Sequence, residues 1–156
     1  MTQLFKSATE VAEEIETRLK RITVANGYLT DIGAAVHMGR IAIDDTMVPC
    51  SSVIEGDDQV TNSSGRSSLA KIGQEYALVG YAECHPDRPN DTAHKVIRDL
   101  KRAIFMTDGR QNSDFGGRVD RIDYRGRNIG PRADGAGKVM ALIEITVFYT
   151  EQLGGI

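Results

Sequence analysis

The sequence predicts an α/β (α+β) domain, built as a single mixed, mainly antiparallel sheet with two helices packed against it. The chain has 156 residues, which is the size of one ordinary domain, so we expect residues 1–156 to form a single domain. Apolar residues make up 40% and charged residues 26%, so the chain can bury a core. Its apolar residues recur at helical spacing in two stretches and alternate at strand spacing elsewhere, which predicts the order α-β-β-β-α-β-β-β.

The first predicted helix begins at Ser7. Ser7 and Glu10 have the spacing of a capping box, in which the Ser7 side chain accepts the Glu10 backbone N–H. Asn26-Gly27 is the expected stop, because glycine readily ends a helix. The apolar stripe expected to face the core is Val11, Ile15, Leu19 and Ile22.

Three strands are predicted next. Residues 31–38 alternate between apolar and other residues, as a strand with one buried face does. Residues 48–54 form a second strand, and Pro49 places it at a sheet edge or at a strand start, because proline cannot donate to the ladder. Residues 76–82 are apolar on both alternating sets, which indicates a central strand.

The second predicted helix follows Pro86 and Pro89, with Asn90 or Asp91 as its cap and Asp108-Gly109 as its end. Residues 119–124 and 128–132 then predict a hairpin around a turn at 125–127. Residues 138–150 predict the longest strand. The apolar stripe of this helix is Ala93, Val96, Ile97, Leu100 and Ile104.

Two segments carry little that a core could bury. Residues 57–74 are polar and rich in serine, and residues 108–118 end in Gly116-Gly117. Segments of this length without secondary structure are usually functional or disordered. We therefore expect long flexible loops at 57–74 and 108–118.

Composition and motifs argue against most enzymatic chemistry. Nineteen basic and 22 acidic residues give a net charge of −3, unlike a dedicated nucleic-acid binder. The two cysteines have no spacing of a zinc site, and 135–138 resembles a phosphate-binding loop but leads into a strand. No apolar run is long enough to cross a membrane. We expect no catalytic, cofactor-binding or metal-binding residues.

One acidic set keeps an enzyme hypothesis open. A small metal-dependent nuclease would need converging carboxylates. Residues 120 and 123 are an odd number of positions apart, so their carboxylates would point to opposite faces of a strand. The set comprises Asp57, Asp58, Asp120 and Asp123.

Three stretches together carry a resemblance to a known family. They are residues 19–33 (LKRITVANGYLTDIG), the helix after Asn90-Asp91-Thr92, and the closing run 143–151 (IEITVFYTE). In these pieces and their order the chain resembles the tail terminator proteins of long-tailed bacteriophages.

The resemblance implies a structural role in a virion. Such subunits form a ring, here expected to be a homohexamer, which caps the head-proximal end of the tail tube, stops its polymerisation and joins the tail to the head or neck. The implied partners are the tail tube protein and the head–tail connector, and DNA would pass through the lumen without specific binding. The implied location is the virion tail, and the host cytoplasm during assembly.

The ring also needs contact residues, and the two predicted loops offer basic side chains. We expect ring-to-ring or lumen contacts at Arg66, Lys71, Arg110 and Arg118. The alternatives are another phage neck, head–tail completion or tail-tube protein, and then the nuclease.

Overall fold

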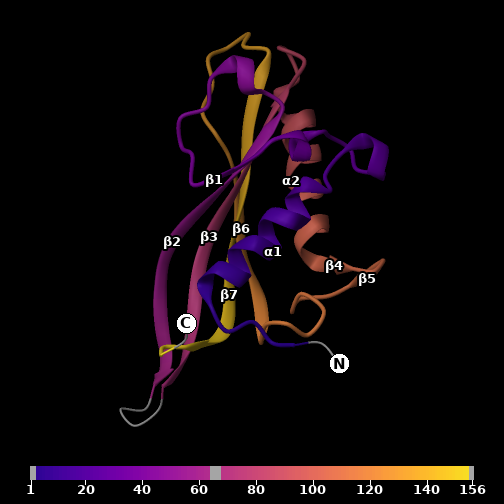
Figure 1. Cartoon of the computed structure of the whole chain (residues 1–156). Helices are drawn as coiled ribbons and strands as arrows, with labels where there is room; N and C mark the ends of the chain where they lie inside the picture. The colour runs from indigo at the N-terminus through magenta and orange to yellow at the C-terminus, as the bar shows by residue number, and fades with distance from the viewer. Residues whose placement is uncertain (1–2, 64–67, 155–156) are drawn as a thin grey trace.

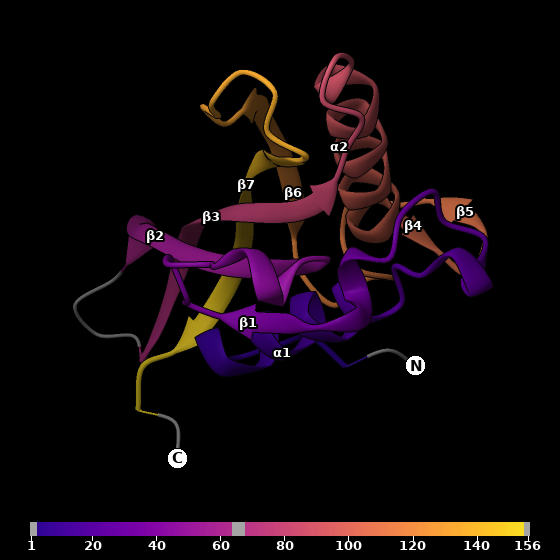
Figure 2. The ribbon, with the colours of Figure 1, turned by 90° about the horizontal axis from the view of Figure 1, so that it is seen from above.

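Two helices lie on one face of a five-stranded sheet (Figures 1 and 2). The computed structural model describes residues 3–63 and 68–154. Helices α1 (Ala8–Lys20) and α2 (Pro89–Phe105) are the two predicted ones. The sheet has the order β1-β2-β3-β7-β6, and β4 with β5 forms a small second sheet. The α+β class, with a mixed and mainly antiparallel sheet, is therefore confirmed.

The strands are antiparallel except at one edge. The short β1 runs parallel to β2, whereas β2, β3, β7 and β6 alternate in direction. The strands are β1 (Val36–Met38), β2 (Cys50–Ser63), β3 (Leu69–Glu83), β4 (Met106–Thr107), β5 (Arg110–Gln111), β6 (Arg121–Ile129) and β7 (Lys138–Gln152).

The pair β3–β7 forms the centre of the sheet. It is in continuous register from Leu69 opposite Gln152 to Glu83 opposite Lys138. On the face under the helices, Leu78 lies opposite Ile143 and Tyr76 opposite Ile145, and all four side chains are buried. Because side chains alternate between faces, this one face forms the core with the helices.

Helix α1 begins as predicted and ends earlier. The Ser7 side chain accepts the Glu10 N–H at 3.3 Å. The helix ends at Lys20, whereas Gly27 closes a separate 3₁₀ turn over Val24–Asn26. The reason is that the Thr23 backbone is extended and its side chain caps this new turn. All four residues of the predicted stripe are fully buried, namely Val11, Ile15, Leu19 and Ile22.

Helix α2 differs from the prediction at both ends. It begins at Pro89, not at Asn90 or Asp91, because proline is well tolerated in the first turn, where its missing N–H has no partner to lose. It ends at Phe105, since Met106 is extended and starts β4. The predicted stripe from Ala93 to Ile104 is buried.

The predicted loop over 57–74 is wrong. Strand β2 continues to Ser63 and β3 starts at Leu69, and they pair as far as Ser63 opposite Ala70. This part of the hairpin lies at the edge of the sheet, where β2 is exposed to solvent. Its side chains need not be apolar there, so a polar sequence is compatible with a strand. Residues 64–67 lie outside the described residues.

Two other strand predictions are corrected. Residues 32–34 form a 3₁₀ turn, because the Gly33 N–H bonds to the Ile22 carbonyl at 2.8 Å, and only Val36–Met38 is a strand. The predicted turn at 125–127 is a β-bulge inside a continuous β6. Gly126 has φ +132°, a value that suits glycine and lets the strand resume its pairing after the bulge.

Helix α2 packs closely on the sheet at Gly80. A Cβ added there would lie 2.5 Å from Val96 Cγ1 and 2.8 Å from Ile32 Cδ1. We expect Gly80→Ala to lower the free energy of unfolding by about 1–3 kcal/mol, because the extra methyl overpacks the core. Denaturant unfolding measures it. Gly137→Ala is the matched control, since the nearest atom to its added Cβ is 4.0 Å away; equal losses at both positions would contradict the packing argument.

Two buried tyrosines face the core from β3 and β7. Burial raises the pKa of Tyr76, and burial, with Glu151 next, raises the pKa of Tyr149 to about 12. The folded state thus favours the neutral phenols. Their contribution to the free energy of unfolding is complete below about pH 10, the pKa of tyrosine in the unfolded chain, and is lost as pH rises towards 12.

The Tyr76 hydroxyl is buried and has no hydrogen-bond partner among the described residues. We expect Tyr76→Phe to raise the free energy of unfolding by about 1 kcal/mol at pH 7, because it removes an unsatisfied polar group. It should also reduce the loss of stability above pH 10. Unfolding curves from pH 7 to 11 measure both effects, and a variant less stable than the wild type at pH 7 would contradict this account.

Candidate assembly surfaces

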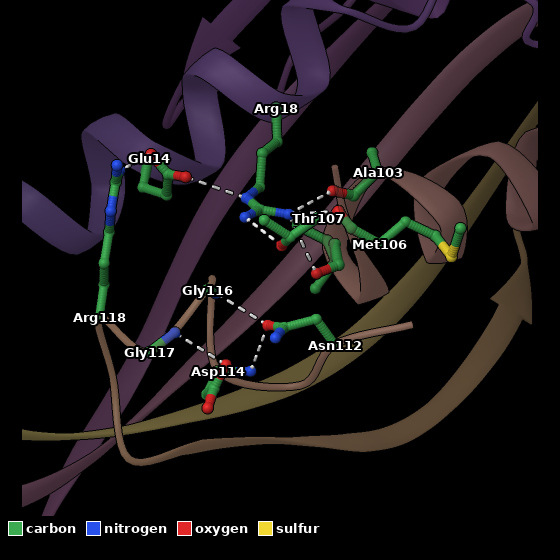
Figure 3. Close-up of polar contacts among 11 residues, drawn as sticks. Glu14, Arg18, Ala103, Met106, Thr107, Asn112, Asp114, Gly116, Gly117 and Arg118 are labelled. Carbon is green, nitrogen blue, oxygen red and sulfur yellow. Dashed lines mark hydrogen bonds and ion pairs between the residues drawn. The ribbon is translucent and has the colours of Figure 1, made fainter. Parts of the chain in front are cut away.

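A buried arginine joins the two helices to the segment that follows α2 (Figure 3). Arg18 on α1 is 2% exposed. Its guanidinium donates to the carbonyls of Ala103 at 3.1 Å and Met106 at 2.8 Å, and to Thr107 Oγ1 at 2.9 Å. These carbonyls belong to the end of α2, where backbone acceptors lack helical partners and a cation is favoured. Burial lowers the pKa of Arg18, and Glu14 at 3.1 Å opposes that shift.

The same network holds residues 108–118 in place. Glu14 also pairs with Arg118 at 3.3 Å (Figure 3). The Asn112 side chain accepts the N–H groups of Asp114 and Gly116. The Phe115 ring is 1% exposed and lies 4.6 Å below the Arg18 guanidinium. The segment predicted as a loop at 108–118 thus contains the short strand β5, and side-chain hydrogen bonds and one buried ring support its turns.

A second polar clamp ties the chain after α1 to α2. Asp99 is 1% exposed and accepts the N–H groups of Leu29 and Thr30, and the Thr30 hydroxyl at 2.7 Å. Nearby, Arg102 donates to the Gly27 carbonyl at 2.7 Å. Both clamps satisfy groups inside the subunit, so they build the scaffold and leave its outer surfaces for assembly.

Three of the four predicted contact residues belong to the described chain, and they lie in different segments. Arg66 lies outside the described residues. Lys71 is exposed on β3, and Arg110 is exposed on β5. The Arg118 side chain is 44% exposed and is engaged with Glu14. The structure thus distributes these positions over separate elements.

The sheet face opposite the helices contains a shallow hollow of about 310 Å³. Charged side chains of both signs line it, including Glu75 on β3, Arg125 on β6 and Glu144 on β7. Ala77 and Ile54 form part of its floor. No helix covers this face (Figure 2), so the hollow is open to a partner.

Opposite edges of the sheet carry opposite charge, which the sequence prediction missed. Exposed Glu55, Asp57 and Asp58 lie on β2, and exposed Arg121, Arg125 and Arg127 lie on β6. The signal was present in the sequence, but 57–74 was assigned to a loop and 125–127 to a turn. With both stretches assigned to strands, the charges fall on the two flanks of one sheet.

The four carboxylates of the nuclease hypothesis are not brought together. Asp57 and Asp58 belong to β2, whereas Asp120 and Asp123 lie at β6, with β3 and β7 between them. Three strand spacings separate the two pairs, which is about 14 Å. Among the described residues, no group of three or more His, Cys, Asp or Glu side chains could hold a metal ion.

Comparison with solved structures gives a structural likeness. No protein-family model matches the chain, and no curated protein matches it. The chain is similar to one in a solved structure described as "Virion of native gene transfer agent (GTA) particle", with a TM-score of 0.55 and 11% sequence identity. The match covers 88% of this chain and 92% of that chain. At this identity the likeness establishes a shared fold. Across residues 3–63 and 68–154, neither helix is long and apolar enough to span a membrane.

The role of Arg18 leads to a stability prediction. We expect Arg18→Ala to lower the free energy of unfolding by about 3 kcal/mol, because it leaves several helix-end carbonyls without their donor and removes one of the two partners of Glu14. Chemical denaturation measures the change. Lys20→Ala, two residues along the same helix and paired with Glu16 in solvent, should cost less than about 0.5 kcal/mol. A loss at position 18 as small as that at position 20 would show that the network does not support the fold.

Proposed function

We propose that this chain is a structural protein of a phage-type virion, and that it forms a ring at the head-proximal end of the tail tube. The observation that carries the proposal is the fold shared with a chain of a virion particle, over 88% of one chain and 92% of the other. A match over this share of both chains takes in most of the fold, which supports the proposal. The resemblance of 19–33, the second helix and 143–151 to tail terminators supplies the position in the tail.

The surfaces of the subunit suit a ring. A closed ring needs two different complementary patches on each subunit, so that each copy contacts the next by the same rotation. The sheet has two lateral edges of opposite charge. The Arg18 and Asp99 clamps hold the two helices and their connecting segments together on the sheet between these edges. The ring would end tube growth by covering the last tube subunits and would present its other rim to the neck.

The proposed partners follow from this position. They are further copies of the chain, expected to make a homohexamer, the tail tube protein, and the head–tail connector. Exposed Lys71 and Arg110 are proposed contacts to an adjoining ring. DNA would pass through the lumen without specific binding, in keeping with the net charge of −3.

The proposal predicts both a mass and a phenotype. Light scattering behind size-exclusion chromatography should give about six times the 17.1 kDa of one chain. In the phage that encodes the chain, deletion of the gene should give overlong tails without heads by electron microscopy, because nothing caps the tube.

The phenotype also separates the alternatives. Tails of normal length that lack heads would replace the terminator role by that of another neck or head–tail completion protein. Normal tails joined to heads would contradict a role in tail completion. Divalent-ion-dependent cleavage of DNA that Asp120→Ala abolishes would support the nuclease hypothesis instead.

A further inference from the structure

Both lateral edges of the sheet lack a strand along most of their length. The short β1 covers only Ser51–Val53 of β2, so the remainder of that strand has β3 on one side alone. At the opposite edge β6 pairs only with β7. Within the described chain, one backbone bond lies on the outer side of β6, from the Ile122 N–H to the Ser113 carbonyl at 2.6 Å. The edges 54–63 and 124–129 are thus open to another strand.

Neither open edge carries the proline or lysine that often blocks a free edge. Proteins commonly protect free edges with proline or lysine, because unpaired N–H and C=O groups recruit other strands. Residues 54–63 and 121–129 contain neither proline nor lysine. Each edge instead carries charge of one dominant sign, acidic on β2 and basic on β6.

The charges on these edges are not neutralised inside the subunit. Glu55, Asp57 and Asp58 make no ion pair within the part of the chain that the structure describes, and the same holds for Arg125 and Arg127. Arg121, by contrast, pairs with Asp123 on its own strand at 3.2 Å. Clusters of like charge on a free edge repel one another, and an edge of opposite charge relieves that repulsion.

The bulges of the two edge strands add to this complementarity. The register of β2 shifts between Glu55 and Asp58, and that of β6 shifts between Tyr124 and Gly126. Asp57 and Arg125 are therefore bulge residues with no partner across the inner strand. Asp57 is acidic and Arg125 is basic, so the bulge of each edge presents a charge opposite to that of the other bulge.

Strand direction allows the two edges to meet. Because β2, β3, β7 and β6 alternate in direction, β6 runs opposite to β2 within one subunit. A rotation about an axis along the strands preserves these directions. The β6 edge of one copy would therefore lie antiparallel to the β2 edge of the next, which is the geometry of an ordinary antiparallel ladder.

From these observations we propose that the ring closes edge to edge: β6 of one copy adds to β2 of a second copy, with Arg125 and Arg127 against Glu55, Asp57 and Asp58. The helices then lie on one side of a continuous wall of sheet, and the face that contains the hollow lies on the other. This inference rests on the proposed ring. It names the surface and the residues through which the ring forms.

A charge-swap experiment tests the proposal on the full chain. One variant is Arg125→Glu with Arg127→Glu, and the other is Glu55→Arg with Asp57→Arg. Each variant alone brings like charges together and should fall from ring to single-chain mass by light scattering. A 1:1 mixture should recover the ring, because every contact then joins opposite charges and the two variants alternate. Native mass spectrometry should find equal numbers of each in a recovered ring.

Matched controls separate an edge effect from a general charge effect. Lys20→Glu with Arg88→Glu changes the net charge as much as the arginine variant does, but on exposed helix positions, and should form the ring normally. Circular dichroism checks that each variant folds. If the double arginine variant does not fold, Arg127→Glu alone serves, since Arg127 does not line the hollow as Arg125 does.

The outcomes distinguish this inference from the proposed function. A wild-type ring that both swap variants also form, or a mixture that stays monomeric, would overturn the edge contact and leave the virion role intact. A wild-type chain that remains monomeric at millimolar concentration would contradict the edge contact. The virion role would then be decided by the tails of the deletion phage.

Discussion

The fifteen-residue ladder between β3 and β7 is the constraint on which the rest of the structure depends. Each of these strands uses its other side to hold one more long strand, β2 next to β3 and β6 next to β7. The ladder therefore fixes how far apart the acidic and basic edges lie. It also provides the apolar face, through Leu78 and Ile143, on which both helices pack. A shift of its register by one residue would turn the apolar side chains outward, so the core can form only if the register is correct.

Polar clamps extend this constraint to the layer above the sheet. Arg18 closes the end of α2 and orders the segment up to Arg118, and Asp99 holds the chain after α1. Each clamp satisfies backbone groups that would otherwise be buried without partners. Most of the polar groups in the interior are thus paired, although the Tyr76 hydroxyl has no partner among the described residues. Unneutralised charges of opposite sign lie on the two sheet edges, which suits the proposed contact between copies.

The sequence predicted those elements whose signal is local. The stripe from Val11 to Ile22 and the long alternation of β7 require only a period, and both were correct. The polar end of the β2–β3 hairpin could not be predicted, because at a sheet edge neither face needs apolar residues. The predicted turn around Gly126 is a bulge in the structure. A glycine with positive φ is compatible with a turn and with a bulge, so the sequence did not distinguish them. Residues 108–118 were taken as flexible because the partner of Phe115, which is Arg18, lies almost 100 residues earlier. The residues of the proposed edge contact were the hardest to predict, because the charges of the two edges can be compared only when the strand order is known.

The place of β6 in the chain has a consequence for biosynthesis. Its partner in the sheet, β7, is made after it, so β6 has no ladder to join until the ribosome has released residues 138–152. The hairpin β2–β3 lies earlier in the chain, and both of its strands have been made once Glu83 is added. A nascent chain therefore has its acidic edge long before its basic one. If the edges are the contact, two chains that both lack β7 have no matching pair of edges to join, and oligomer formation is postponed until residues 138–152 have been made.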